Sequence, residues 1–247
     1  MLTLWAKTSG TWINILLVIL GTLSGLLLRY RLSSKMQTII TQAVGLTPIF
    51  IGISMAQALS GASVSGVEGV ILALLALVLG GLLGEWWQLD ARLVSLGDWI
   101  KSRVKGGNRF TEGFVAASLL FCIGPMTILG SLNNGLLNDD TILVVKSTMD
   151  GLVSIALTGT YGIGVGFSVV PILLYQGGLS LIAGTLAQSV PNPDSDPTVL
   201  LITGTGGIMI LGLGFNLLDA SKIRIASFIP ALVLGPIIGW IATLILS

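Results

Sequence analysis

The chain has 247 residues, of which 53% are apolar and only 9% are charged. Soluble domains carry roughly 25% charged residues, and the mean hydropathy of +0.96 lies in the range of membrane proteins. The composition therefore excludes an ordinary soluble fold. The formal net charge of +1 and the lack of a basic patch exclude a nucleic-acid partner.

Hydrophobic segments long enough to cross a bilayer follow one another along the whole chain. A helix needs about 20 apolar residues to cross a hydrocarbon core of about 30 Å. The fold class predicted is all-α, a polytopic membrane helix bundle that forms a single domain over residues 1–247. The eight predicted spans are residues 11–28, 39–60, 67–87, 113–135, 143–166, 169–189, 198–218 and 225–246.

The division between the fifth and sixth spans depends on glycine and proline. Residues 142–189 are too long for one span, and Gly162, Gly164, Gly166 and Pro171 interrupt them. Glycine and proline are the strongest local breakers of regular structure. We therefore predict a tight turn near residues 167–170.

The distribution of basic residues predicts the orientation of the spans. With eight spans, ten of the twelve lysines and arginines fall in three loops on one side of the membrane. Cytoplasmic loops carry an excess of these residues, so both termini are predicted to be non-cytoplasmic in a bacterial plasma membrane. The ten are Arg29, Arg31, Lys35, Arg92, Lys101, Arg103, Lys105, Arg109, Lys222 and Arg224, whereas Asp139, Asp140, Asp194 and Asp196 lie in loops of the opposite side.

Residues 85–110 follow the third span with a different pattern. Between residues 85 and 105, apolar residues recur at spacings of three and four, and charged residues lie between them. This pattern predicts an amphipathic helix on the cytoplasmic interface, with tryptophan at the level of the lipid headgroups. One interpretation is an anchor for the topology, and the other is a docking site for a partner.

Two pairs of segments indicate an internal repeat. Residues 76–84 match residues 231–239 at six of nine positions, and residues 49–54 resemble residues 209–214. The offsets, 155 and 160 residues, are nearly equal. Because five spans separate the copies, they run in opposite directions, as in many secondary transporters and some channels. The predicted inverted repeat relates spans two and three to spans seven and eight, within halves 11–87 and 169–247.

Helix-breaking residues lie inside two spans. Gly124 and Pro125 interrupt the fourth span, and Pro48 lies in the second. Backbone groups inside lipid must be satisfied internally, so a broken helix is tolerated only where protein or a cavity surrounds it. One interpretation is a discontinuous helix that lines a solute path. The other is a kink packed with small residues.

Two charged residues lie inside the fifth span. Lys146 and Asp150 are four residues apart, so they share one helix face and can pair. A central aspartate costs roughly 2.5–3.5 kcal/mol on membrane insertion, which favours a binding role for Asp150. A structural pair and a pair that reaches the interface are the alternatives.

Other polar residues lie within the predicted spans. Asn14, Thr47 and Gln57 belong to the first two spans. Singly, each is typical of a hydrogen bond between helices, but together they indicate a polar interior around Lys146 and Asp150. The predicted ligands for a solute or ion beside that pair are Ser131, Asn134, Tyr175, Gln176 and Asn216.

Enzyme chemistry lacks its usual residues here. The sequence contains no histidine and a single cysteine, Cys122. Histidine is the commonest metal ligand and proton shuttle, and Ser-His-Asp and Cys-His arrangements cannot form without it. We therefore expect no metal site, no cofactor and no enzyme activity, and interpret Cys122 as an unreactive residue of a helix.

Four motifs taken together resemble the YqgA/YdfK-like family of bacterial inner-membrane proteins, a domain of unknown function. They are Gly-Pro-Met-Thr-Ile-Leu-Gly-Ser at 124–131, Lys-Ser-Thr-Met-Asp-Gly at 146–151, Leu-Tyr-Gln-Gly at 174–177 and Leu-Gly-Asp-Trp-Ile-Lys at 96–101. The resemblance covers almost the whole chain. It implies a family suspected of transport and supplies neither a substrate nor site residues.

Two functions are compatible with these patterns. The first is a small secondary transporter or channel for a solute or ion, with its site between spans four and five. The alternative is a non-transporting membrane protein, such as an assembly factor, sensor or partner-binding scaffold. Apart from the lipid bilayer, a homo-oligomer is one expectation, because small-residue faces serve either a dimer contact or packing within the chain. These faces contain Gly21 and Gly25, Gly80 and Gly84, and Gly235 and Gly239.

Overall fold

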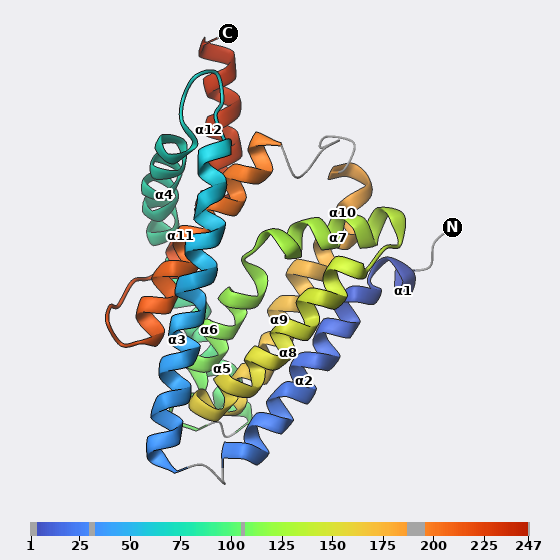
Figure 1. Ribbon diagram of the computed structural model, residues 1–247, viewed down its shortest axis with the longest axis vertical. Coiled ribbons are helices and arrows are strands. Elements are labelled where there is room, and N and C mark those ends of the chain that lie inside the picture. The colour runs from blue at the N-terminus through green and yellow to red at the C-terminus, as the bar shows by residue number, and fades with distance from the viewer. Residues whose placement is uncertain (1–3, 30–32, 105–106, 187–195, 247) are drawn as a thin grey trace. The chain divides into compact units, whose positions relative to one another are not determined.

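The computed structural model describes residues 4–29, 33–104, 107–186 and 196–246 (Figure 1). These residues form helices and turns, and their only β pairing is an isolated bridge between Val64 and Val67. The predicted all-α class is thus confirmed. Of the residues used to predict the orientation, Arg31, Lys105 and Asp194 lie outside the described part.

Within the described residues, seven helical segments are long and apolar enough to cross a membrane. A further pair, Phe110–Cys122 and Met126–Leu136, passes the same test together but is bent by 72°. Counted as one broken span, this pair gives the predicted total of eight. The seven are Ser9–Arg29, Thr38–Gly61, Gly69–Trp86, Thr141–Tyr161, Ile163–Ala183, Pro197–Leu217 and Ile225–Ile245.

The described chain divides into two compact units. Unit 1 comprises Met1–Val44 and Val94–Pro191, and unit 2 comprises Gly45–Leu93 and Asn192–Ser247. The helices of unit 1 are α1 (Leu4–Lys7), α2 (Ser9–Arg29), α6 (Phe110–Cys122), α7 (Pro125–Leu137), α8 (Thr141–Tyr161), η2 (Ile163–Ser168), α9 (Val169–Ile172), η3 (Leu173–Gly177) and α10 (Gly178–Leu186). Helices α3 (Ser34–Ala56) and α5 (Leu89–Val104) cross the boundary between the units, and unit 2 also contains η1 (Gln57–Gly61), α4 (Gly69–Trp86), α11 (Pro197–Leu217), η5 (Ile225–Phe228) and α12 (Ala231–Leu246).

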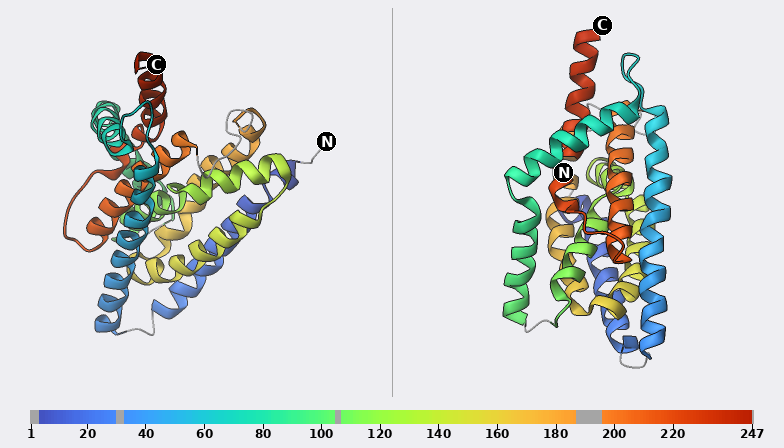
Figure 2. Two further views of the ribbon diagram at one scale, coloured as in Figure 1. Left: turned by 45° about the horizontal axis from the view of Figure 1, so that its top comes forward. Right: turned by 90° about the vertical axis from the view of Figure 1, so that its left-hand side faces the viewer.

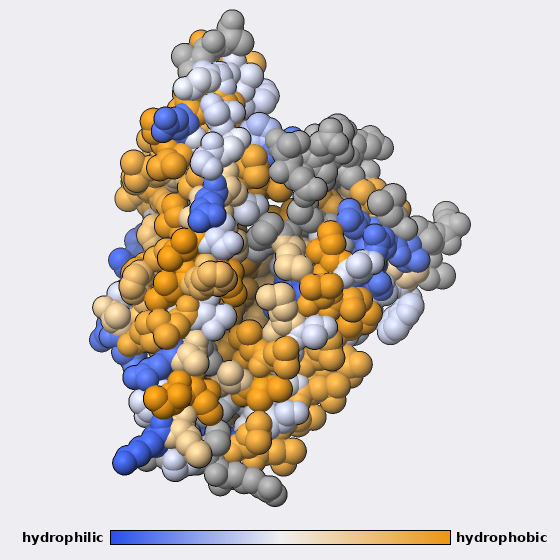
Figure 3. Space-filling view, in the orientation of Figure 1, coloured by the Kyte–Doolittle hydropathy of each residue, from blue (hydrophilic) through white to orange (hydrophobic). Residues whose placement is uncertain are grey.

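In unit 1, α2 and α8 lie side by side along most of their length (Figures 1 and 2). Gly21 and Gly25 face α8 so closely that a methyl group on either would overlap a backbone carbonyl oxygen, that of Gly151 or Ile155. These small residues therefore serve packing within the chain. Large apolar side chains of both helices, such as those of Leu23 and Leu152, are exposed, as expected for surfaces that meet lipid. Figure 3 shows that hydrophobic residues cover much of this face of the molecule.

The turn between the fifth and sixth spans begins earlier than predicted. Helix α8 ends at Tyr161, and Gly162 adopts a φ of 82°, a conformation that glycine reaches without steric cost. The predicted turn at residues 167–170 instead continues η2 into α9. Pro171 is tolerated there because it lies in the first turn of α9, where a backbone N–H has no partner within the helix.

The predicted helix over residues 85–105 is divided in two. Helix α4 ends at Trp86, and Gln88 takes a left-handed φ of 54° before α5 begins at Leu89. On α5, Gly97 and Ile100 are buried, whereas Trp99 is 56% exposed. This distribution is amphipathic, and the interfacial position of α5 remains a prediction.

In unit 2, α4 packs against α12 through small residues. Gly80 contacts Ala231, and Gly235 faces Ala76 with a distance of 3.8 Å from its ideal Cβ position to the methyl carbon. In the sequence match, Gly80 corresponds to Gly235 and Ala76 to Ala231, with an offset of 155 residues. Each glycine therefore contacts the alanine of the other copy, and a two-fold relation between the copies would require such reciprocal contacts.

An ion-pair cluster lies where α4 ends in unit 2. Arg224 bonds Glu85, and Ser227 donates a hydrogen bond of 3.3 Å to the other Glu85 oxygen. Asp90 lies beside them, and burial raises the pKa of its carboxyl group, partly offset by the Ala226 backbone and Arg224. The folded state therefore holds the Asp90 proton more tightly than the unfolded state does.

A raised pKa predicts a stability that falls as the pH rises above the ordinary value of 3.8. Asp90→Asn is expected to reduce this loss in a thermal unfolding series from about pH 4 to pH 7. Asp139→Asn is the contrasting variant, because hydrogen bonds from Thr141 lower the Asp139 pKa. It should remove stability that the wild type gains as the pH rises towards 3.8, in a series extended down to about pH 2. Equal slopes in both variants would contradict the assignment.

Candidate functional site

The buried charges of unit 1 lie on one face of α8. Lys146 and Asp150 form an ion pair whose side chains are only 8% and 12% exposed. Helical spacing of four residues alone brings the two groups together. In a helix long enough to cross the membrane, each charge would be costly without the other.

Helix α2 supplies a fully buried amide to this pair. Asn14 donates from Nδ2 to Asp150 Oδ2 at 3.0 Å and to Gln176 Oε1 at 3.0 Å. Gln176 in turn donates from Nε2 to Thr11 Oγ1 at 3.3 Å. Because a carboxylate only accepts hydrogen bonds, Asp150 fixes the orientation of Asn14, and Asn14 fixes that of Gln176.

Gln176 reaches the cluster from an irregular turn of helix. Residues Leu173–Gly177 form a π-helical turn between α9 and α10. Such turns are rare and occur frequently at functional sites. The turn buries Gln176 almost completely, at 1% exposure, whereas the neighbouring Tyr175 remains 37% exposed. Of these two predicted ligands, the structure brings only Gln176 into hydrogen-bond contact with the cluster.

The break between α6 and α7 lies near the pair. Helix α6 ends at Cys122, Gly124 is in extended conformation, and α7 begins at Pro125. Proline suits this first position because its missing N–H would have no partner there. Cys122 lies within electrostatic range of both Lys146 and Asp150, and the space beside Gly124 is open, with no heavy atom within 4 Å of its ideal Cβ position.

Helix α7 carries a second polar cluster near its end. Asn134 accepts a hydrogen bond of 3.1 Å from the Gly10 backbone and donates to Ser9 Oγ at 2.9 Å. Ser9 donates to Asp140 at 2.7 Å, which ties α2 to the start of α8. Ser131 lies one turn before Asn134, is fully buried and has no hydrogen-bond partner among the described residues.

Two predicted residues serve other roles. Asn216 lies in unit 2, where its amide bonds both backbone groups of Ile223 and the Ser221 hydroxyl, which fastens the loop after α11. Pro48 is buried within α3, which runs through it without interruption. Neighbouring groups commonly re-satisfy the backbone around a proline in membrane helices.

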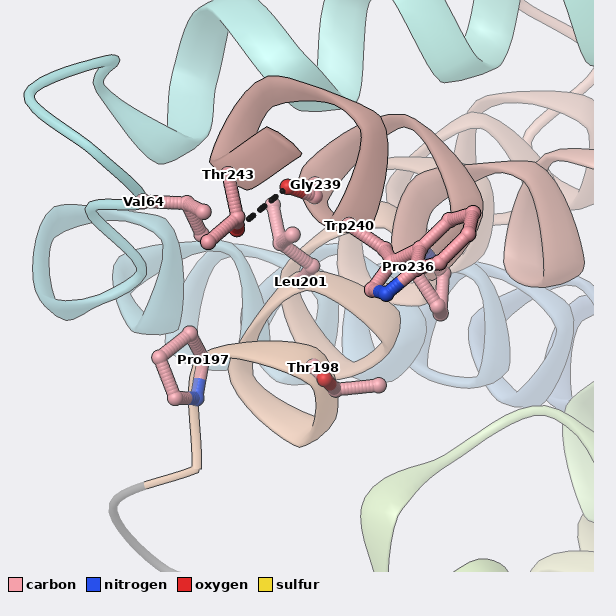
Figure 4. Close-up of a pocket in the computed structure, with 8 residues that line it drawn as sticks. All are labelled: Val64, Pro197, Thr198, Leu201, Pro236, Gly239, Trp240 and Thr243. Atoms are coloured by element: carbon pink, nitrogen blue, oxygen red, sulfur yellow. Dashed lines mark hydrogen bonds between the residues drawn. The ribbon is translucent and has the colours of Figure 1, made fainter. Parts of the chain in front are cut away.

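Unit 2 contains a separate pocket of about 190 Å³ (Figure 4). Pro236 and Trp240 of α12 line it together with Thr198 of α11. The Thr243 hydroxyl donates to the Gly239 carbonyl at 3.0 Å. None of the lining residues is charged, so this pocket offers a solute no ionic contact.

The residues that sequence reasoning undervalued are both on α2. Asn14 appeared only as one polar residue of the first span, and Thr11 was not singled out. Their spacing of three residues places them on one face with Gly21 and Gly25. That polar, small-residue stripe was the available signal.

Among the described residues, no group of three or more histidine, cysteine, aspartate or glutamate side chains could hold a metal ion.

Comparison with known proteins finds relatives of this chain in two bacteria. It is 30% identical over 230 residues to the "Uncharacterized membrane protein YdfK" of Bacillus subtilis, covering 93% of this chain and 94% of the relative. It is 28% identical over 235 residues to the "Uncharacterized protein YqgA" of Escherichia coli, covering 92% and 94%. No solved structure matches. The family model "Protein of unknown function (DUF554)" matches residues 9–240, so the chain belongs to the DUF554 family of membrane proteins.

Proposed function

We propose that this protein is a small secondary transporter or channel for a small solute or ion, with its site between α6–α7 and α8. The buried Lys146–Asp150 pair carries this proposal. Ionisable groups inside membrane helices are rare and mark solute paths, proton relays or ligand sites. Here the pair also engages Asn14 from a second helix.

Two irregular helices adjoin the same pair and support the proposal. The α6–α7 break leaves Cys122 within electrostatic range of it, and the π-turn of η3 directs Gln176 towards Asn14. Broken helices at membrane depth are tolerated where they line a cavity or are buried in protein. A purely structural ion pair would require neither irregularity.

The orientation and the repeat are part of the same proposal. Basic loop residues favour non-cytoplasmic termini in a bacterial plasma membrane, and both relatives named above are bacterial proteins. The reciprocal Gly80–Ala231 and Gly235–Ala76 contacts favour an inverted repeat of spans two and three with spans seven and eight. An interfacial position for α5 is consistent with the exposure of Trp99.

Flux measurements in reconstituted vesicles test the proposal. A panel of salts, amino acids and sugars is first screened for compounds that raise the melting temperature, because a ligand that prefers the folded state stabilises it. Flux of each such compound is then measured. Asp150→Asn should abolish flux, because it removes the carboxylate that Asn14 and Lys146 share.

Glu112→Gln is the matched control for this experiment. It makes the same acid-to-amide change in a side chain that is 60% exposed and pairs with Arg109. Flux should remain at the wild-type level in this control. Equal flux in Asp150→Asn and wild-type vesicles that contain folded protein would exclude Asp150 from the site.

A non-transporting role is the second candidate, and one observation favours it. Lys146 contacts Asp150 directly, so the pair is closed. In such a protein α5 would bind a partner through exposed residues such as Leu96 and Trp99. Vesicles that show no flux for any stabilising compound would favour this function over transport.

A further inference from the structure

The Lys146–Asp150 pair leaves part of its hydrogen-bonding capacity unused. The lysine ammonium has three donors, yet its one hydrogen bond within the described residues goes to Asp150 Oδ2. Asn14 donates its hydrogen bond to the same oxygen of Asp150, and no described residue bonds the other carboxylate oxygen, Asp150 Oδ1. The side-chain carbonyl oxygen of Asn14 is also buried, and it accepts no hydrogen bond from the described part of the chain. Buried polar groups normally have partners, so the cluster has unused capacity for a further species.

The charge balance restricts what that species can be. Lys146 is the one described cation that acts on Asp150, and Cys122 is the other titratable group within range of the pair. If the ammonium leaves Asp150, another positive charge must replace it, because an isolated buried carboxylate is strongly unfavourable. The atoms that would receive it are oxygens of Asp150 and Asn14, which suit a hard cation.

The amide chain can adjust to such an exchange. At present Asn14 presents its NH₂ group to both Asp150 and Gln176. This row of hydrogen bonds ends at the Thr11 hydroxyl, which can donate a hydrogen bond as well as accept one. Both amides can therefore reverse together, and Asn14 then turns its carbonyl oxygen towards the ion without losing its bond to Gln176.

We propose that Asp150 binds a small monovalent cation and that Lys146 is a tethered competitor for the same carboxylate. The inference rests on the proposed transport site and names its ion. With Lys146 on Asp150 the site is closed, and with a cation on Asp150 the ammonium is displaced. A proton is the smallest cation of this kind, and Na⁺ or K⁺ is the other.

The test removes the competitor from the purified full-length protein. Melting temperatures of wild type, Lys146→Met, Asp150→Asn and the double variant are measured in NaCl, KCl and choline chloride at equal ionic strength, near pH 6 and near pH 8. Lys146→Met should be least stable in choline at the higher pH. Saturating cation should raise its melting temperature by on the order of 5–10 °C.

The outcomes distinguish a metal cation from a proton as the positive charge that replaces Lys146. A rise in NaCl or KCl above choline at the higher pH identifies a metal cation, and a rise only on acidification identifies the proton. The double variant and Asp150→Asn should respond to neither. Equal effects of all three salts with no pH response, or the same responses in the double variant, would overturn the inference.

A second variant covers the case in which Lys146→Met does not fold. Asn14→Asp keeps the lysine but also gives the cluster a net negative charge, so it should acquire the same dependence on cations. A lack of dependence in Asn14→Asp would then overturn the inference. Cation binding without flux would reject only transport, and Asp150-dependent flux without cation binding would reject only this inference.

Discussion

Replacing Lys146 by Met is expected to lower the free energy of unfolding by about 3–5 kcal/mol, because it leaves a buried carboxylate without its charge partner. The two side chains are 8% and 12% exposed, so water compensates little of this loss. Chemical unfolding in a mild detergent, with choline chloride as the salt, measures the effect. The pair is thus expected to be far more costly to break than a surface pair.

Removing both charges should be much less harmful. Replacing a buried ion pair by apolar residues of similar volume is often neutral or stabilising, so Lys146→Met with Asp150→Leu should recover most of the loss. Glu112→Met is the control, because the pair that Glu112 forms with Arg109 is 60% and 39% exposed and should contribute less than about 1 kcal/mol. A double variant whose loss equals the sum of the single losses would show that the charges do not interact.

Replacing Gly21 by Val should be the most disruptive change in the packing of α2 on α8. Its added Cβ would overlap the Gly151 carbonyl oxygen, and a backbone atom cannot move aside as a side chain can. Overpacking typically costs about 1–3 kcal/mol. Separation of the helices would also weaken the Asn14–Asp150 hydrogen bond, which adds about 1.5–3 kcal/mol for a bond to a charged group.

The same substitution at Gly159 is the matched control for Gly21. Gly159 also lies in this helix pair, but its ideal Cβ position meets no atom within 4 Å. It borders an apolar groove of about 220 Å³ that can accept the valine methyl groups. Thermal unfolding should therefore change little in Gly159→Val. Equal losses in the two variants would contradict close packing at Gly21.

Local chemistry was sufficient for several predictions. Hydropathy predicted the apolar helices because a bilayer demands about 20 apolar residues in each span. The Gly124–Pro125 pattern marked the position of the bend between α6 and α7. Helical spacing alone placed Lys146 and Asp150 on one face. Each of these features depends on residues that are neighbours in the sequence.

Other features were decided only by the tertiary structure. Asn14 meets Asp150 across 136 residues and Gln176 across 162, and no local pattern records which faces of apolar helices pack together. The sequence left open whether the face of Gly21 and Gly25 serves a dimer or an internal contact. In the structure this face packs closely on α8, which is an internal contact.

The sequence by itself thus determined which helix carries the buried ion pair. Residues four apart lie on the same face of a helix, so the positions of Lys146 and Asp150 were sufficient. The tertiary structure decided that Asn14 and Gln176 join the pair and that Asn216 holds a separate loop. The physical reason is the near uniformity of apolar helices. Their hydrophobicity drives insertion into the bilayer, whereas shape and hydrogen bonds between distant residues select their neighbours.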